Sequence, residues 1–381
     1  MTVYIFYSSY LDDLGEKRSV GGVQTYISML SDVVKEIGMV PVVYQFAKYD
    51  FDKEIDNVRV VGVAVKQGWS FSKKKRHVFE KITQVFNDEE DILIFATDYL
   101  CVKNSYRRVI AIQHGVAWDI KRHENWNKFL NRLYIFKQAL GSYIKSKRHD
   151  WCKTLVCVDY NFLNWYRTQL AYIPNKVRVI PNAVEVNKVN RTPPNREGDD
   201  KSDKVKIIFA RRFVPYRGTR IFTDAIKKVL EKFTNVEVTI AGDGPDRTYM
   251  EERLRGYSNV KFIEYDVSKT FEIHSQHDIA VVPSIGSEGT SFSLLEAMAS
   301  GCAVIATNVG GMTNIIINRY NGILVNPAAE ELYEAIEELI QDSSLRNRIG
   351  RLGRQTVECG FNLQTWKDSW KKVLLETAKI H

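Results

Sequence analysis

The sequence predicts an α/β protein with two doubly wound parallel sheets. Short runs rich in β-branched residues alternate with segments of helical periodicity along most of the chain, which is typical of parallel sheets covered by helices. A chain of 381 residues exceeds what one hydrophobic core usually holds, so two domains are expected. A polar, proline-containing stretch at 185–204 separates two alternating halves and has the composition of an exposed linker.

Each half contributes its own set of expected elements. In the first half the expected strands are 3–7, 40–45, 58–63, 92–96, 109–113 and 155–158. Apolar side chains recur at helical spacing in 23–37, which predicts a helix there. In the second half the expected strands are 205–209, 236–240, 260–263, 279–282 and 302–307, with helices at 221–233, at 246–254 and before Ser300. A last helix is expected at 363–380. Two such Rossmann-like halves facing a cleft would bind ligands at the carboxyl ends of their strands.

Composition and charge favour a cytoplasmic enzyme. The five cysteines are an odd number without a C-x-x-C pair, so neither a disulfide framework nor a zinc site is expected. The N-terminal residues lack the features of a signal peptide, and no apolar run approaches the length that spans a bilayer. The net charge of +8, from 54 basic and 46 acidic residues, would suit nucleic acid. No nucleic-acid partner is expected, because no helix-turn-helix, zinc-finger or RNP motif is present.

The most informative segment is 288–311, EGTSFSLLEAMASGCAVIATNVGG. Its two glutamates, Glu288 and Glu296, are eight positions apart, and Glu296 lies inside the expected helix, where a carboxylate can accept hydrogen bonds from two ribose hydroxyls. Unpaired N–H groups and the helix dipole attract anions to a helix N-terminus. That N-terminus is formed by Thr290, Ser291 and Phe292.

This block resembles the signature of retaining GT-B-fold glycosyltransferases of family 4 (glycosyltransferase group 1), in which two glutamates flank seven residues. The resemblance implies that Glu296 holds the ribose of a nucleotide donor and that Glu288 lies beside the donor sugar. It implies also that the backbone of Thr290, Ser291 and Phe292 holds the donor phosphates and sugar. A glycine usually stands three residues after the first glutamate, and this chain has Ser291 there.

Two further segments of the second half resemble motifs of the same family. The segment 209–218, FARRFVPYRG, resembles a G-R-x-x-x-x-K-G motif whose two cations bind the donor diphosphate, which assigns that role to Arg212 and Arg217. A guanidinium suits it, because its fork of donors binds phosphate at two points and stays charged. Arg211 replaces the usual glycine of this motif, and Arg217 the usual lysine. The G-D-G turn of Gly242 and Gly244 would let backbone approach the donor closely.

The first half carries a glycine pair and one histidine that also match. Gly21 and Gly22 resemble a loop that contacts the donor phosphate, and His114 matches a histidine that contacts the donor sugar and the reacting centre. The segment around Asn182 resembles the one that closes the first domain. No metal is expected. The other histidines are expected to be solvated: His77, His123, His149, His274, His277 and His381.

Together these motifs imply an organisation and an activity. The expected parts are an acceptor-binding domain at 1–184, a linker at 185–204, a nucleotide-sugar-binding domain at 205–362, and a helix at 363–381 that packs back on the first domain. The implied reaction is metal-independent and cofactor-free transfer, with retention, from a nucleotide-diphosphate sugar to a saccharide or lipid-linked acceptor in polysaccharide or glycolipid assembly. A nucleotide-sugar epimerase or a phosphorylase of the same fold is the alternative.

A basic region of the first half suggests where the protein works. Between Lys103 and Lys153 there are twelve Lys or Arg and three acidic residues. A predicted helix within 126–140 places aromatic and aliphatic residues among them, which is typical of a membrane-surface element. A core-facing helix with solvated lysines fits the pattern equally well. On the first interpretation the protein is peripheral, with its first domain on anionic lipid at the inner face of a membrane.

Overall fold

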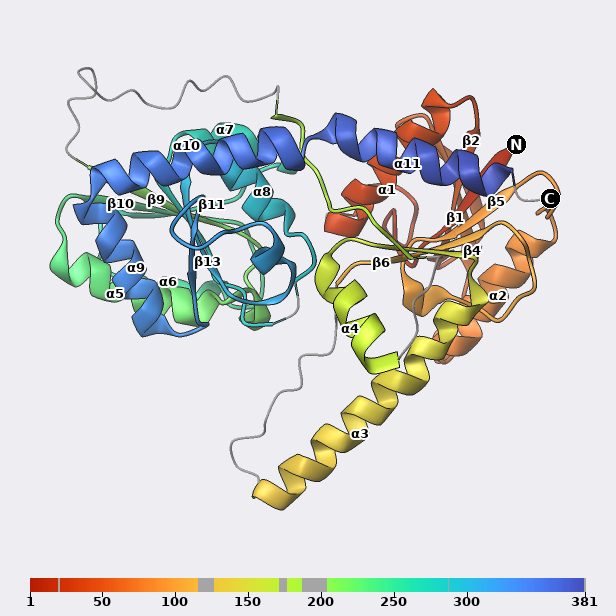
Figure 1. The fold of residues 1–381 in the computed structure, drawn as a ribbon, viewed down its shortest axis with the longest axis horizontal. Helices are drawn as coiled ribbons and strands as arrows, with labels where there is room; N and C mark the ends of the chain where they lie inside the picture. The colour runs from red at the N-terminus through yellow and green to blue at the C-terminus, as the bar shows by residue number, and fades with distance from the viewer. Residues whose placement is uncertain (20, 116–126, 171–176, 187–203, 287, 380–381) are drawn as a thin grey trace. The chain divides into compact units, whose positions relative to one another are not determined.

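The computed structural model describes residues 1–19, 21–115, 127–170, 177–186, 204–286 and 288–379 (Figure 1). The chain divides into two compact units, one of residues 1–180 and 366–381 and one of residues 181–365. Each unit has a central, largely parallel sheet with helices against it, which confirms the predicted α/β class. The linker expected at 185–204 lies almost entirely outside the described residues, and the expected domain boundaries at 184 and 362 stay predictions.

The first unit is built on an eight-stranded sheet in the order β3-β4-β2-β1-β5-β6-β7-β8. β3 pairs antiparallel with β4, and the other pairs are parallel. The central strands are buried and strongly apolar, as strands covered on both faces must be. The strands are β1 (Thr2–Phe6), β2 (Val40–Ala47), β3 (Phe51–Ile55), β4 (Val58–Ala64), β5 (Ile92–Phe95), β6 (Val109–Gln113), β7 (Thr154–Cys157) and β8 (Val177–Val179).

Helices cover both faces of this sheet. Figure 1 shows α1 and α11 on one face and α2 and α4 on the other, whereas α3 extends away from the sheet. Two 3-10 turns, η1 (Asp98–Leu100) and η2 (Lys147–Trp151), follow β5 and α3. The helices are α1 (Gly22–Glu36), α2 (Phe71–Thr83), α3 (Lys128–Ser146), α4 (Tyr160–Leu170) and α11 (Leu363–Ala378).

The edge hairpin of β3 and β4 is an element that the sequence prediction missed. Its two-residue loop is Asp56-Asn57, with φ of 51° and 59°, the left-handed conformation that such hairpin turns require. β3 itself, FDKEI, is only half-buried and holds two apolar residues. The sequence pattern of β3 is a weak signal for a strand, because an edge strand that faces solvent needs few apolar side chains.

The second unit is built on a six-stranded parallel sheet in the order β11-β10-β9-β12-β13-β14. Successive residues of a strand face opposite sides, so Ile207 and Phe209 enter the core under α5 and α9, and Ile208 and Ala210 the core under α8. The strands are β9 (Val205–Ala210), β10 (Val236–Ala241), β11 (Val260–Ile263), β12 (Ile279–Val282), β13 (Ala303–Thr307) and β14 (Ile323–Val325). The helices are α5 (Thr219–Lys232), α6 (Arg247–Arg253), α7 (Thr270–Ser275), α8 (Phe292–Ala299), α9 (Ala329–Gln341) and α10 (Ser343–Gly360), with 3-10 turns η4 (Pro215–Arg217), η5 (Val267–Lys269) and η6 (Gly310–Asn314).

Three of the histidines expected to be solvated are buried, so that expectation is wrong for them. The Nδ1 of His274 lies 2.8 Å from the carbonyl of Thr270, and burial lowers the pKa of His274 to about 4. His277 lies 2.8 Å from the hydroxyl of Thr239 through Nε2, and His149 hydrogen-bonds a carboxylate of the first unit. Backbone carbonyls and hydroxyls thus satisfy imidazoles within the core, which sequence pattern alone does not reveal.

Two special features are absent from the described residues. No described helix is long and apolar enough to cross a membrane. In the same ranges, His, Cys, Asp and Glu side chains form no group of three or more that could hold a metal ion.

The helix α11 belongs to the first unit through an aromatic cluster. The indole Nε1 of Trp370 donates to the hydroxyl of Tyr26 on α1 at 2.8 Å, with both side chains fully buried. The Tyr26 ring also makes edge contacts with Trp366 at 5.1 Å and with His114 at 4.9 Å. Tyr26 therefore packs against both the C-terminal helix and the imidazole of His114.

We expect Tyr26→Phe to destabilise the first unit by about 1–3 kcal/mol, because it leaves the buried indole N–H of Trp370 without its acceptor. Chemical denaturation followed by tryptophan fluorescence measures this change. The matched control is Tyr143→Phe, since Tyr143 is half exposed on α3, and its effect should stay within about 0.5 kcal/mol. Equal effects of the two substitutions would contradict the assigned role of the Tyr26 hydroxyl.

Candidate functional site

The candidate site of the second unit lies where its strand order reverses. β9 leads outward to β10 and β11, and the chain then returns to place β12 on the other side of β9. In open α/β sheets, ligands bind beside the carboxyl ends of the strands at such a point. The loops that follow β9 and β12 are 211–218 and 283–291, and they hold most of the residues singled out from the second half of the sequence.

At the centre of the site, three donors converge on one oxygen of Glu288. The guanidinium groups of Arg211 and Arg217 and the hydroxyl of Ser284 all bond to its Oε1, the Ser284 bond being 2.6 Å long. Arg211 also donates to the Ser284 hydroxyl at 2.6 Å. These contacts join the loop after β9 to the loop after β12. The sequence predicted roles for Glu288 and Arg217 and missed Arg211 and Ser284.

The charges of this cluster fix the ionisation of Glu288. Burial alone would raise the pKa of Glu288, but the positive charges of Arg211 and Arg217 and their hydrogen bonds lower it to about 2. Burial lowers the pKa of Arg211, yet an arginine stays charged in a protein. The three ionic groups therefore leave a net charge of one unit positive in a buried place, which suits an anionic ligand.

The glycines of the G-D-G turn let the Arg211 loop pack directly on the next loop. A Cβ added at Gly242 would lie 2.1 Å from the carbonyl oxygen of Arg211, and one at Gly244 would lie 2.5 Å from that of Phe213. Both glycines have positive φ, 138° and 150°, which other residues rarely adopt. The structure thus gives both glycines a packing role, and their predicted approach to a donor stays a prediction.

The loop before α8 is held by its neighbours and leads into a helix start without a side-chain cap. The backbone N–H of Gly311 donates to the carbonyl of Glu288 at 2.6 Å, and the side-chain amide of Asn182 donates to the carbonyl of Thr290 at 2.6 Å. Ser291 is the N-cap of α8, and its hydroxyl makes no capping bond to the helix. The first N–H groups of α8, at Phe292 and beyond, therefore suit an external anion.

Glu296 lies within α8, about two turns from Glu288, in a different electrostatic environment. Burial raises the pKa of Glu296 to about 7, and a hydrogen bond from the Thr270 hydroxyl and the charge of Arg211 offset this only in part. The Thr270 Oγ1 lies 3.1 Å from Oε2 of Glu296. One glutamate of the pair is thus firmly ionised, while the other takes up or releases a proton near neutral pH.

Arg212 is the predicted site residue that the structure leaves outside the cluster. Its side chain is exposed, next to the buried Arg211, because successive residues of the extended chain point to opposite sides. Arg217 is partly buried and lies 5.1 Å from the ring centre of Tyr216. The two arginines assigned to one diphosphate thus differ in surroundings, and only Arg217 contacts Glu288.

His114 and the glycine pair belong to the first unit. The His114 Nε2 lies 2.8 Å from the carbonyl oxygen of Ala96, which follows β5, and burial lowers the pKa of His114 to about 4. The ring is therefore neutral near pH 7, with Nε2–H as the donor and a lone pair on Nδ1. Gly21 and Gly22 stand at the N-terminus of α1, where the extended φ of Gly21, 174°, suits any residue. A Cβ added at Gly21 would lie 2.4 Å from Oε1 of Gln24, the end of a flexible side chain.

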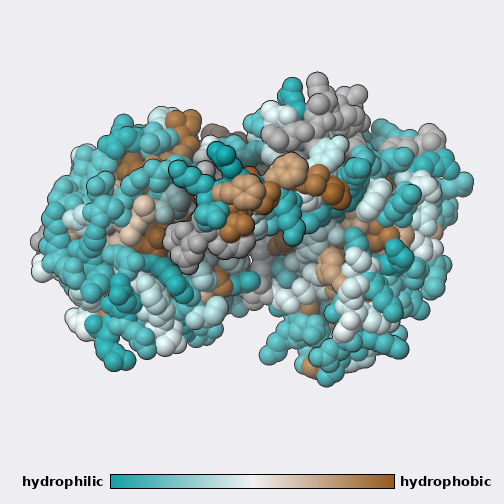
Figure 2. All heavy atoms as spheres, turned by 90° about the horizontal axis from the view of Figure 1, so that it is seen from below, coloured by the Kyte–Doolittle hydropathy of each residue, from teal (hydrophilic) through white to brown (hydrophobic). Residues whose placement is uncertain are grey.

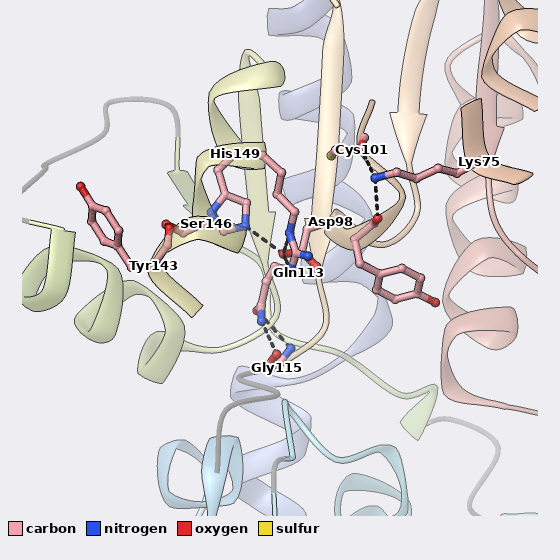
Figure 3. A network of polar contacts seen from close by, with 10 residues as sticks. Lys75, Asp98, Cys101, Gln113, Gly115, Tyr143, Ser146 and His149 are labelled. Carbon is pink, nitrogen blue, oxygen red and sulfur yellow. Dashed lines mark hydrogen bonds and ion pairs between the residues drawn. The ribbon is translucent and has the colours of Figure 1, made fainter. Parts of the chain in front are cut away.

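The first unit also contains a buried ionic network that the sequence did not reveal (Figure 3). Asp98, just after β5, accepts hydrogen bonds at Oδ2 from Arg148 at 2.7 Å and from His149 at 2.8 Å. Burial acts to raise the pKa of Asp98, and these two partners more than offset it, so the pKa lies below its usual value. The network joins η2, at the end of α3, to the carboxyl end of the sheet.

Comparison with known proteins finds a family match within the second unit and similar proteins over longer stretches. Residues 204–342 match the family described as "Glycosyl transferases group 1". An uncharacterised glycosyltransferase of Methanocaldococcus jannaschii is 34% identical over 256 residues, 65% of this chain and 62% of that protein. A human phosphatidylinositol N-acetylglucosaminyltransferase protein is 26% identical over 296 residues, 76% of this chain and 58% of that one. A phosphatidyl-myo-inositol mannosyltransferase of Mycobacterium leprae is 27% identical over 195 residues, 50% of this chain and 51% of that one. The chain therefore spans between half and two thirds of these relatives.

Solved structures match over the full length of the chain. Sucrose-phosphate synthase from Thermosynechococcus elongatus has a TM-score of 0.77 at 15% identity and covers 98% of both chains. Anabaena HepE in complex with UDP and glucose has a TM-score of 0.72 at 17% identity and covers 99% of this chain and all of that one. At these identities the likeness establishes the fold, and the sequence match of the second unit establishes the class of enzyme. Residues 204–342 thus match the group 1 glycosyltransferases, the chain is similar to an uncharacterised glycosyltransferase over 72% of its length, and it has the GT-B fold.

Proposed function

We propose that the protein is a retaining, family 4 glycosyltransferase that moves a sugar from a nucleotide-diphosphate donor to a glycolipid or polysaccharide acceptor. The observation that carries this proposal is the Glu288 cluster, in which the buried Arg211 and the partly buried Arg217 bind a carboxylate three residues before the N-cap of α8. Two comparisons support the donor and the acceptor. HepE was solved with UDP and glucose, and the phosphatidylinositol-modifying relatives act on lipids, as their names state.

In this proposal the second unit stabilises the departing diphosphate. The leaving group gains negative charge in the transition state, and preorganised donors in a dry site stabilise such charge best. Arg217 and the first N–H groups of α8 supply these donors, and the exposed Arg212 adds a second cation. Their charges do the work that a metal ion does elsewhere, so we propose a metal-independent reaction without a cofactor.

The main role of Glu288 would be to orient the guanidinium group of Arg217. Its Oε1 is already bonded to Arg211 and Ser284, so it stays compensated when Arg217 turns towards a phosphate. A carboxylate with a pKa near 2 is also a poor proton acceptor at neutral pH. The acceptor hydroxyl would therefore attack from the face that the diphosphate leaves and pass its proton to the leaving phosphate. Attack on that face gives retention of configuration.

His114 would contribute a neutral hydrogen-bond acceptor. Because Nε2–H is engaged by the carbonyl of Ala96, the lone pair of Nδ1 remains for a hydroxyl of the donor sugar. The low pKa ensures that this holds throughout the physiological range. Gly21 and Gly22 remain the proposed backbone contact to the donor phosphate, and the proposed place of work remains the cytoplasmic face of a membrane.

A donor panel with and without acceptor tests the proposed function. UDP-, GDP-, ADP- and TDP-sugars are screened by thermal shift, since a ligand at 100 times its Kd stabilises the fold by about 2.7 kcal/mol. For the donor that binds, release of free nucleoside diphosphate is then followed. Release that requires a glycolipid or saccharide acceptor supports a transferase. Acceptor-independent conversion of the donor would indicate an epimerase, and a requirement for inorganic phosphate would indicate a phosphorylase.

We expect Glu296→Ala and Glu296→Gln to weaken donor binding by about 1.5–3 kcal/mol, because the ribose hydroxyls lose a charged acceptor. Titration calorimetry with the donor or its nucleoside diphosphate measures the effect. The control is Glu272→Gln, a carboxylate on α7 that is exposed and should leave the Kd unchanged. A Kd within twofold of wild type for both Glu296 variants would remove Glu296 from the donor site.

We expect the affinity for the donor to rise about tenfold between pH 6 and pH 8, because only ionised Glu296 accepts two ribose hydroxyls. Its folded pKa of about 7 is raised above the unfolded value near 4.5, so its contribution to stability is present below pH 4.5 and is lost as pH rises through 7. Donor binding near pH 7 should release a proton, visible as a buffer-dependent enthalpy. Glu296→Gln should abolish both effects.

We expect Arg217→Ala and Arg212→Ala to lower kcat more than donor affinity, because the charge of the leaving diphosphate is greatest in the transition state. Arg217→Lys should keep most of the activity, because a lysine can still place a positive charge on the phosphate. Steady-state kinetics with the donor found by the panel measures the three variants. If Arg217→Lys were as inactive as the alanine variant, the assigned role of this position would be wrong.

We expect Arg211→Met to destabilise the second unit by about 3–5 kcal/mol, because it removes one partner of a buried ion pair. The neighbouring Arg212→Met is the matched control, since its side chain is exposed, and it should change stability by less than about 0.5 kcal/mol. Urea denaturation of the two variants provides the comparison. Similar stabilities would show that Glu288 does not depend on Arg211.

A further inference from the structure

Helix α3 of the first unit buries almost none of its residues. Of its 19 residues, Lys128–Ser146, only Ser146 is buried. Figure 1 shows the helix extending away from the sheet that the other helices of the unit cover. Asn131, Ile135 and Gln138, on one side of the helix, are only partly covered. The helix therefore gains little from packing, and its exposed apolar side chains on the other side need a second surface to bury them.

Six large, exposed apolar side chains of α3 lie on one face, and the exposed Leu130 lies outside it. They follow one another at intervals of three, four or one residues, which places them within one side of a helix. Figure 2 shows hydrophobic side chains among hydrophilic ones on the side seen from below, towards which α3 extends. Their exposed fractions are 68% for Phe129, 50% for Leu133, 68% for Phe136, 48% for Leu140, 50% for Tyr143 and 57% for Ile144.

The charges of α3 are all positive. The helix contains no Asp or Glu, and its cations are Lys128, Arg132, Lys137 and Lys145. At 100° per residue, Arg132 and Lys137 fall on the two borders of the apolar face, and both are exposed. Apolar side chains bordered by long cations suit an interface where hydrocarbon meets anionic headgroups, because the stems lie along apolar surface while the charges stay in water.

One end of α3 is firmly attached to the unit. Directly after the helix, Arg148 and His149 of η2 bind the buried carboxylate of Asp98, and the Ser146 hydroxyl donates to the carbonyl of Tyr143 at 2.6 Å (Figure 3). The amide of Asn104 donates to the carbonyl of Trp151 at 3.0 Å. The exposed face of α3 is therefore presented from a fixed base.

We propose that the apolar face of α3 docks on an anionic lipid surface, with Phe129 and Phe136 entering the headgroup boundary and Arg132 and Lys137 contacting lipid phosphates. This inference deepens the proposed function and rests on it for a lipid acceptor. A second copy of the chain is the rival occupant, because the spacing would also suit a two-helix seam. Charge decides between them, since two copies of α3 would bring cations together with no acidic residue to pair them.

Vesicle sedimentation of the full-length protein tests the proposal. The vesicles contain phosphatidylcholine alone, or phosphatidylcholine with phosphatidylglycerol. We expect binding to the anionic vesicles only, weakened by salt. Phe129→Ser with Phe136→Ser, and separately Arg132→Gln with Lys137→Gln, should each weaken that binding about tenfold or more. Because these side chains are exposed, the substitutions should leave the melting temperature unchanged.

Matched controls on the second unit distinguish binding through α3 from nonspecific apolar or electrostatic binding to vesicles. The apolar control is Ile317→Ser with Tyr320→Ser, at positions 66% and 50% exposed. The charge control is Arg255→Gln with Lys269→Gln, both exposed. Both controls should bind vesicles as the wild type does. Equal losses in control and α3 variants, equal binding to neutral vesicles, or no binding at all would each overturn the proposal.

Two further readouts separate the alternatives. Analytical ultracentrifugation of the same variants detects a dimer, and a dimer that Phe129→Ser with Phe136→Ser dissociates, without vesicle binding, would assign α3 to a protein interface and overturn lipid docking. Turnover of the nucleotide sugar with a water-soluble acceptor should be unchanged in the α3 variants. Turnover without vesicle binding would refute the docking surface alone, and α3-dependent vesicle binding without turnover would refute the proposed function alone.

Discussion

The second unit depends on keeping one carboxylate ionised inside the protein. Glu288 is buried, and an isolated charge there would be costly, so it is compensated by two guanidinium groups and a hydroxyl. These partners come from the loops after β9 and β12, which the reversal of strand order brings side by side. The glycines that follow β10 then allow the Arg211 loop to lie flat on its neighbour. The contacts that hold these loops together are therefore the same ones that set the geometry of the site.

The two glutamates of the same motif are held in opposite electrical states. Glu288 has arginine partners and a pKa near 2, whereas Glu296 has a hydroxyl partner and a pKa near 7. The difference arises from partners, because burial acts to raise the pKa of both carboxyl groups and only Glu288 has arginines bonded to it. A site built in this way separates a permanent anion, which orients cations, from a carboxyl group whose charge responds to what binds beside it.

The first unit also holds a buried carboxylate, that of Asp98, which accepts hydrogen bonds from an arginine and a histidine. There the ion cluster secures the base of α3, a helix whose own residues make almost no core. An exposed, wholly basic helix on a rigid base differs from every other described helix of the unit, each of which buries an apolar stripe or an aromatic cluster. This contrast is why α3 is best explained by a surface outside the protein.

The sequence by itself determined the α/β class, the two parallel sheets and the positions of most strands, because apolar runs and helical periodicity are local signals. It also pointed to Glu288 and Glu296 through their spacing. Only the tertiary structure decided which arginine lies on Glu288, since Arg211 and Arg212 are neighbours in sequence and differ only in which side of the strand end they face. The edge strand β3, the buried histidines and the Asp98 network were likewise decided by contacts across long stretches of sequence. Ionisation depends on those contacts, so the sequence could name the titrating groups of the site but not their charge.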